Sequence, residues 1–353
     1  MPMGSASGKL AHRSIARPGA HRVNMLDRRV AHLTMRRESP DRSGGNRTRN
    51  FDMPIWIPIA VAAALFQSWR TAMQQKLRNL LSVNGAGFVR YLYGMPTALV
   101  LLLIALAVTG APVPAMNAWF LLYCVLGGLF QIVATNLLIM SFGYRNFAVG
   151  TAYSKTDAMQ SAILATIVLR EELRPLTWVG MSIGLVGVMT LSLTGRGMKP
   201  KELLAATVQP AAVCGLGSGL VFAFTTIFIK LGNQSLVGPS LLVRALFTLL
   251  ITNTLQILMQ GAYLYWREPR ELKKAFTSWR TSMWVGTLSG CGSACWFTGF
   301  AIANVAPVRA VGQVEIVFTL LFSRFYLKEV LRRADVAGLS LVVFGVLLVV
   351  IGH

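Results

Sequence analysis

From Pro54 onward the chain divides into about ten long apolar stretches separated by short polar or Gly- and Pro-containing breaks. A helix needs about 20 mainly apolar residues to cross the hydrocarbon core of a bilayer, where no water is available to satisfy strand edges. The pattern therefore predicts an all-α integral membrane protein with ten transmembrane helices. We expect these near 54–75, 87–108, 118–142, 147–169, 176–194, 209–230, 239–265, 281–302, 307–326 and 334–352.

A short motif occurs twice, each time between two apolar stretches: LREELR at 169–174 returns as LKEVLR at 327–332. At a constant offset of 158 residues, 142–189 and 300–347 share 12 identities in 48 positions without a gap. Such similarity indicates an internal duplication. Because each copy contains five spans, the second copy enters the membrane in the opposite direction. The sequence thus predicts two inverted five-helix repeats, which recur in secondary transporters with a substrate site at the repeat interface.

We expect 53–194 to be the first repeat, 195–208 a connecting loop and 209–353 the second repeat. Residues 1–52 carry 11 Lys and Arg and no sustained apolar periodicity, which is typical of disorder. Two alternatives stay open for this leader: a transit peptide, since it is Arg-rich and poor in acids, or an upstream extension of a protein that starts at Met53. The leader supplies a large part of the net charge of +21, which therefore gives no evidence of nucleic-acid binding.

Membrane orientation depends on this leader, because Lys and Arg in short loops favour the cytoplasmic side. The breaks after the first, third, fifth, seventh and ninth helices hold far more Lys and Arg than the other breaks. A chain that starts at Met53 is therefore expected to keep both termini outside. When the leader is counted, the bias nearly vanishes and the sequence does not decide.

Two acids, Asp157 and Glu315, occupy equivalent repeat positions in the middle of apolar stretches. A charge at such depth costs about 2.5–3.5 kcal/mol on insertion scales. One hypothesis is that either or both bind and release protons and so couple solute movement to the proton gradient. The alternative is that they form fixed ion pairs that hold the two halves together. The candidate basic partners are Lys155, Arg309, Arg90 and Arg244.

The fourth expected helix carries a polar stripe. Helical spacing places Ser154, Asp157 and Ser161 on one face, with Tyr153 beside them. The same spacing makes Lys155 point nearly the other way. Such a stripe predicts one wall of a solute path, and the alternative is hydrogen bonding to neighbouring helices, which is common in membrane bundles.

A second polar stripe lies on the first expected helix. It consists of Gln67, Gln74 and either Arg70 or Thr71. On the ninth helix, Gln313 occupies the repeat position of Lys155. Stripes that converge in this way are what a solute path between the halves needs.

The basic residues of the apolar stretches fall into two groups. Lys76, Lys230 and Arg90 lie near helix ends, where long side chains snorkel to the interface. Arg244 and Arg309 are expected to lie deeper. A surplus of buried positive charge would suit a substrate that bears a carboxylate or a phosphate.

The N-terminal portions of the repeats also match after a four-residue shift, Lys76 with Lys230 and Arg90 with Arg244. A Lys that ends the first helix, an Arg in the second, Leu-x-Glu before the fifth and a Gly-spaced fifth helix together resemble the EamA-type members of the drug/metabolite transporter superfamily. The resemblance covers essentially all of 54–352. It implies a ten-helix carrier of small organic solutes, often an exporter of metabolites or drugs, in the bacterial inner membrane. It also implies no ATP and no tightly bound cofactor, while a homodimer stays open as the oligomeric state.

One departure from the family pattern concerns the fourth helix of each repeat. The family commonly has a Pro about fourteen residues before the Glu of its motif, where this chain has Asp157 and Glu315. The ninth helix keeps only the earlier Pro307. A family-style kink at mid-helix therefore lacks its proline.

Two other classes of protein compete with a carrier as interpretations of this sequence. An intramembrane enzyme with zinc or triad chemistry is disfavoured, because the four histidines, at 12, 21, 32 and 353, all lie outside the expected spans. A Ser–Lys or paired-carboxylate enzyme and a non-transporting receptor or assembly subunit stay as alternatives. The glycine-rich stretch 215–219 follows no strand and lacks the P-loop Lys, and the four cysteines lie in apolar helices without metal-ligand companions. We therefore expect no nucleotide, metal or cofactor.

Overall fold

The computed structural model describes residues 54–77, 80–141, 153–194, 209–326 and 333–352, and within these ranges every regular element is an α-helix. The leader 1–52, the loop 195–208 and the second motif copy at 327–332 lie outside the described residues. The helices are α2 (Trp56–Leu77), α3 (Val83–Leu92), α4 (Gly94–Thr109), α5 (Ala118–Ser141), α7 (Asp157–Val168), α8 (Pro175–Thr194), α10 (Pro210–Ser235), α11 (Leu241–Arg267), α12 (Pro269–Thr277), α13 (Trp279–Ile302), α14 (Val305–Gly312), α15 (Glu315–Tyr326) and α16 (Arg333–Gly352).

Four helical segments of the described chain are long and apolar enough to cross a bilayer: α5, α10, α11 and Val83–Thr109, which comprises α3 and α4. Their backbone hydrogen bonds are satisfied internally, as lipid requires. Large apolar side chains on α4 stay exposed, for example Leu103 at 56% and Ile104 at 54%. Apolar surface of this kind is compatible with lipid rather than with water.

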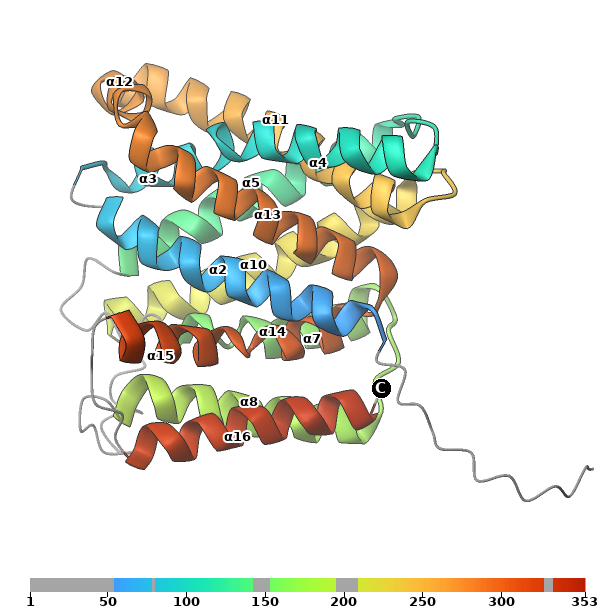
Figure 1. Ribbon diagram of the computed structural model, residues 1–353, viewed down its shortest axis with the longest axis vertical. Helices are drawn as coiled ribbons and strands as arrows, with labels where there is room; N and C mark the ends of the chain where they lie inside the picture. Colours follow the sequence, from blue (N-terminus) through green and yellow to red (C-terminus); the bar gives the residue numbers. More distant parts are fainter. Residues whose placement is uncertain (1–53, 78–79, 142–152, 195–208, 327–332, 353) are drawn as a thin grey trace, which may run out of the picture. The chain divides into compact units, whose positions relative to one another are not determined.

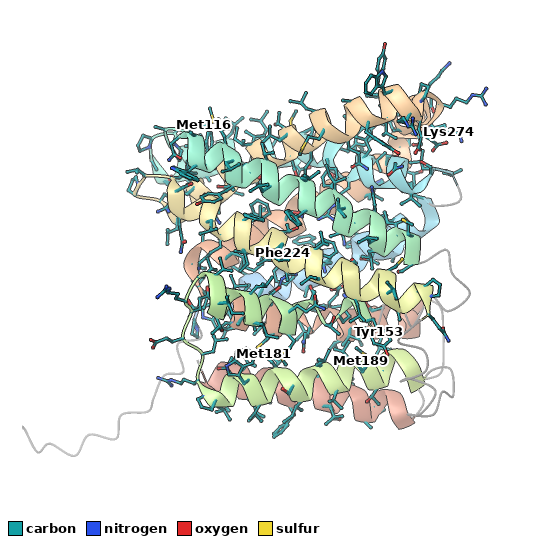
Figure 2. The ribbon with its side chains drawn as sticks, turned by 180° about the vertical axis from the view of Figure 1, so that it is seen from behind. Met116, Tyr153, Met181, Met189, Phe224 and Lys274 are labelled. Atoms are coloured by element: carbon teal, nitrogen blue, oxygen red, sulfur yellow. The ribbon has the colours of Figure 1, made fainter. Side chains whose placement is uncertain are left out.

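The helix ends follow from local sequence signals. Ser82 precedes α3 and accepts a hydrogen bond from the amide of Gly85, which caps the helix. Gly110 ends α4 with φ of +61°, a left-handed conformation that glycine adopts without cost. The short α12 follows Arg267 and links α11 to α13. Figure 2 shows Lys274 of α12 at one end of the helix axes and Met116, which precedes α5, at the other.

The helix contacts repeat between the two halves (Figure 1). Helix α2 packs against α13, and α5 packs against α10. Helix α7 packs against α10, while α14 and α15 pack against α2. Within the internal duplication, α2 of the first copy is equivalent to α10 of the second, and α5 is equivalent to α13. Among the described residues, the α2–α13 contact thus has its counterpart in α5–α10, and the α15–α2 contact has its counterpart in α7–α10.

Helices α8 and α16 pack with their backbones in close contact. A Cβ added to Gly180 would lie 2.7 Å from the carbonyl oxygen of Gly345, and one added to Gly187 would lie 2.8 Å from that of Gly338. Gly180 and Gly338 are repeat equivalents, as are Gly187 and Gly345. The glycines permit an approach that no side chain would allow.

Candidate functional site

A cavity lies among α2, α3, α5, α7, α10, α13 and α14, so both halves of the chain line it. It offers about 60 Å³ to the centres of water-sized molecules, several times the space that one water needs. Its polar and charged lining side chains are Gln67, Arg70, Arg90, Gln131, Ser154, Lys155, Asp157, Thr225, Thr226, Ser293 and Arg309. A smaller adjoining cavity shares part of this lining and adds Gln313 and Glu315.

Two ion pairs cross from one half to the other at this cavity. Lys155 Nζ lies 2.6 Å from Glu315 Oε2, and Arg309 Nη1 lies 3.1 Å from Asp157 Oδ2. The side chains of Glu315 and Arg309 are each 10% exposed, whereas those of Lys155 and Asp157 are 21% and 18% exposed. Ion pairs shielded from bulk water in this way are screened less than surface pairs. The two acids that the sequence singled out are therefore both held by bases of the opposite half.

A hydrogen-bond chain extends from the first pair. Gln67 of α2 donates its Nε2 to Glu315 Oε2 at 2.8 Å, and Trp296 of α13 donates its indole N–H to Gln67 Oε1 at 2.9 Å. Each of these bonds joins residues more than 200 positions apart. The carboxylate of Glu315 is thus held by Lys155 and Gln67, and Gln67 is held in turn by Trp296.

Both acids lie in the first turn of a helix that follows a short irregular turn. Residues 155–156 and 313–314 form these turns at equivalent repeat positions. In them, the amides of Thr156 and Gln313 donate three residues back, to the carbonyls of Tyr153 and Ala310 at 3.2 and 3.1 Å. The helices are therefore interrupted at mid-span without the family proline. A carboxylate is favoured at a helix N-terminus by the helix dipole, which suits Asp157 to this position.

The expected direction of Lys155 was wrong. Regular helical spacing makes this side chain point away from the face of Asp157, yet both line the same cavity. The turn at 155–156 breaks the α-helical spacing on which the expectation depended. Ser154 lines the cavity as well, whereas Tyr153 is buried without lining it. Figure 2 labels Tyr153 near the start of α7.

Two basic residues lie away from this cavity. Arg244 donates its Nε to the carbonyl of Asn233 at 2.9 Å, and a second guanidinium nitrogen contacts the same oxygen. It therefore satisfies the C-terminal end of α10 rather than an acid. Lys230 was expected to snorkel, but it is buried and donates its Nζ to the carbonyl of Ala303 at 2.6 Å. The break between α13 and α14 provides that carbonyl.

The repeated motif has a structural role in the first half. Glu171 accepts hydrogen bonds from the amide of Val305 through both carboxylate oxygens, at 3.1 and 2.9 Å, and so caps α14 of the other half. Arg170 precedes it with φ of +53°. Burial raises the pKa of Glu171, although the Val305 amide and nearby Lys230 act to lower it. The equivalent Glu329 lies outside the described residues.

The sequence did not predict three of the residues that line the cavity, Arg90, Thr226 and Trp296, as part of a solute path. Arg90 was expected to snorkel or to pair with an acid, but it is only 6% exposed and hydrogen-bonds two hydroxyl groups. Thr226 accepts a bond of 2.7 Å from Arg309, whose guanidinium lies over the ring of Trp296 at 5.1 Å. A Trp in the middle of an apolar helix was the available signal for that contact. Among the described residues, no three His, Cys, Asp or Glu side chains cluster as metal ligands would.

Comparison with known proteins gives one family. The model of the EamA-like transporter family matches residues 54–193 and again 209–351. A solved structure titled "Crystal structure of protein" is similar with a TM-score of 0.61 and 16% identity, over 83% of this chain and 95% of that one. At this identity the likeness concerns the fold alone. No curated protein matches the sequence.

Proposed function

Because the chain belongs to the EamA-like transporter family, we propose that it is a secondary active carrier that exports small organic solutes through the cavity between its halves. Members of this family are transporters rather than enzymes, and the apolar helices make the chain an integral, multi-pass membrane protein. On this proposal it lies in a bacterial inner membrane as ten spans. Residues 53–194 and 209–353 would each contribute five of them.

The proposal includes an inverted arrangement of these halves. In such an arrangement, a two-fold axis makes residue n equivalent to residue n + 158. The contact of Gly180 with Gly345 is then equivalent to the contact of Gly338 with Gly187, and both contacts exist. The paired helix contacts of the two halves follow the same rule. Halves related in this way support alternating access, in which one part rocks against the other around a central site.

The observation that carries the proposal is the pair of ion pairs at the cavity. Each joins an acid of one half to a base of the other. Movement between the halves would change the distances across both pairs. We propose that protonation of Glu315 or Asp157 eases this movement, because a neutral carboxyl no longer attracts Lys or Arg electrostatically. A proton gradient would then drive transport.

Metabolite release from overproducing cells tests this function. Cells that make the wild type are compared with cells that hold equal membrane-inserted amounts of Asp157→Asn/Glu315→Gln protein, with and without a proton uncoupler. We expect selective release of a solute class by the wild type alone, and loss of that release with the uncoupler. Equal release by both proteins would contradict coupling through these acids. Release no greater than from cells without the protein would contradict export.

A further inference from the structure

The charges around the cavity do not balance. Arg70, Arg90, Lys155 and Arg309 line it, whereas the acids that line it or the smaller cavity beside it are Asp157 and Glu315. Lys155 and Arg309 are each bound to one of these acids. An excess of two positive charges is left on Arg70 and Arg90.

Among the described residues, Arg70 has few hydrogen-bond partners. Its side chain lies on α2, is 6% exposed and lines the cavity. Its one described hydrogen bond, from Nη2 to Thr71 Oγ1, is long at 3.4 Å, and its buried Nε has no partner. A guanidinium has five N–H donors, and buried donors without acceptors are costly. Glu315 lies close enough to act electrostatically on Arg70, but it is already held by Lys155 and Gln67.

Within the described part of the chain, the hydrogen-bond partners of Arg90 are neutral. It donates Nε to Ser289 Oγ at 2.7 Å and Nη1 to Thr135 Oγ1 at 3.0 Å. It lies close enough to Arg70 for the two charges to repel each other. Two like charges held beside one buried space are stabilised when an anion enters it. Guanidinium groups bind the two oxygens of a carboxylate side by side.

Part of the cavity lining forms an aromatic wall. Trp296, Phe297 and Phe300 of α13 and Phe222 of α10 line it. A wall of this kind favours the apolar body of a ligand, while a few polar groups fix its orientation. The space is small, which favours a compact solute.

From these observations we propose that the carrier binds small organic acids, with the carboxylate on Arg70 and Arg90 and the apolar body against the aromatic wall. This inference rests on the proposed function and names its substrate class. The expected anion contact thus moves from Arg244, which binds the Asn233 carbonyl, and from Arg309, which pairs with Asp157, to the two arginines without an acid partner among the described residues.

Thermal unfolding of the purified full-length protein tests the substrate class. The probes are phenylacetate, its neutral isostere phenylacetamide and the cation phenethylamine, with intrinsic Trp fluorescence as the readout. We expect phenylacetate alone to raise the unfolding temperature. Equal or larger shifts with the amide or the amine, or no shift with any of the three, would overturn the proposal.

Variants of Arg70 and Arg90 test whether phenylacetate binding depends on these two side chains. Arg70→Gln and Arg90→Gln are expected to weaken phenylacetate binding roughly tenfold to a hundredfold, as loss of a charge-assisted hydrogen bond does. Arg70→Lys keeps the charge but not the paired donors, and should fall between. Arg280→Gln changes an exposed residue outside the cavity and serves as the control. Binding that is unchanged in both Gln variants would overturn the assignment.

Failure of this inference is distinguishable from failure of the proposed function. If the wild type releases neutral or cationic metabolites from cells while phenylacetate does not bind, the carrier function stands and the acid class falls. If phenylacetate binds as expected but no solute is released, the site stands and export falls.

Discussion

Replacing Glu315 with Gln is expected to lower the free energy of unfolding by about 3 kcal/mol, the low end of the cost of breaking a buried ion pair. Lys155 would lose its partner and stay beside Arg70, Arg90 and Arg309 at the same cavity. The low end applies because the Lys155 side chain is 21% exposed and keeps some contact with water. Equilibrium unfolding of the purified protein in mixed micelles measures the change.

A double-mutant cycle separates this pair from its surroundings. Lys155→Gln/Glu315→Gln removes both charges, and we expect it to regain most of the stability that the single change loses, since no unpaired charge is left. Strictly additive losses would contradict direct pairing of the two residues. The double variant also isolates function: normal stability combined with lost solute release would assign the pair to transport rather than to assembly.

Replacing Gly180 with Leu is expected to abolish accumulation of folded protein. Even the Cβ would lie 2.7 Å from the carbonyl oxygen of Gly345 and 2.9 Å from the amide nitrogen of Val349. Both neighbours are backbone atoms, so they cannot move aside as a flexible side chain would. The helix pair α8–α16 must separate, and overpacking of this kind typically costs 1–3 kcal/mol, occasionally more. Size-exclusion chromatography of a fluorescent fusion gives the folded fraction.

A glycine in open surroundings provides the control for this change. A Cβ added to Gly217 of α10 would meet only the tip of the Leu137 side chain, at 3.7 Å. Gly217→Ala should therefore leave the chromatographic profile unchanged, whereas Gly180→Ala should already reduce the monodisperse peak. A normal profile for Gly180→Leu would contradict the close contact of the two backbones.

The apolar lengths of the chain predict most helix positions. The stretches expected at 281–302 and 176–194 became α13, Trp279–Ile302, and α8, Pro175–Thr194. Long apolar runs fix such positions because the apolar helix is the structure that lipid permits. The amphipathic α12 was not predicted, because it is short and lies in a polar break.

The candidate site was predictable only in part. Repeat equivalence singled out Asp157 and Glu315, and Lys155 and Arg309 were among the named partners. The pairing itself joins residues 160 positions apart for Lys155 and Glu315, which no local pattern encodes. The prediction that Lys155 points away from Asp157 was wrong because the turn before α7 interrupts the regular helical rotation. The prediction that Lys230 snorkels was wrong because a helix break distant in the sequence provides a carbonyl partner for its side chain.

Side-directed labelling of Ser293→Cys tests alternating access to the cavity most directly. Ser293 of α13 lines the cavity, and the four native cysteines are first replaced so that one thiol remains. A membrane-impermeant maleimide is applied to right-side-out and to inside-out vesicles. Alternating access predicts that the thiol reacts in both preparations while the membrane stays closed to the reagent. Reaction from one side only, with and without a proton gradient, would contradict it.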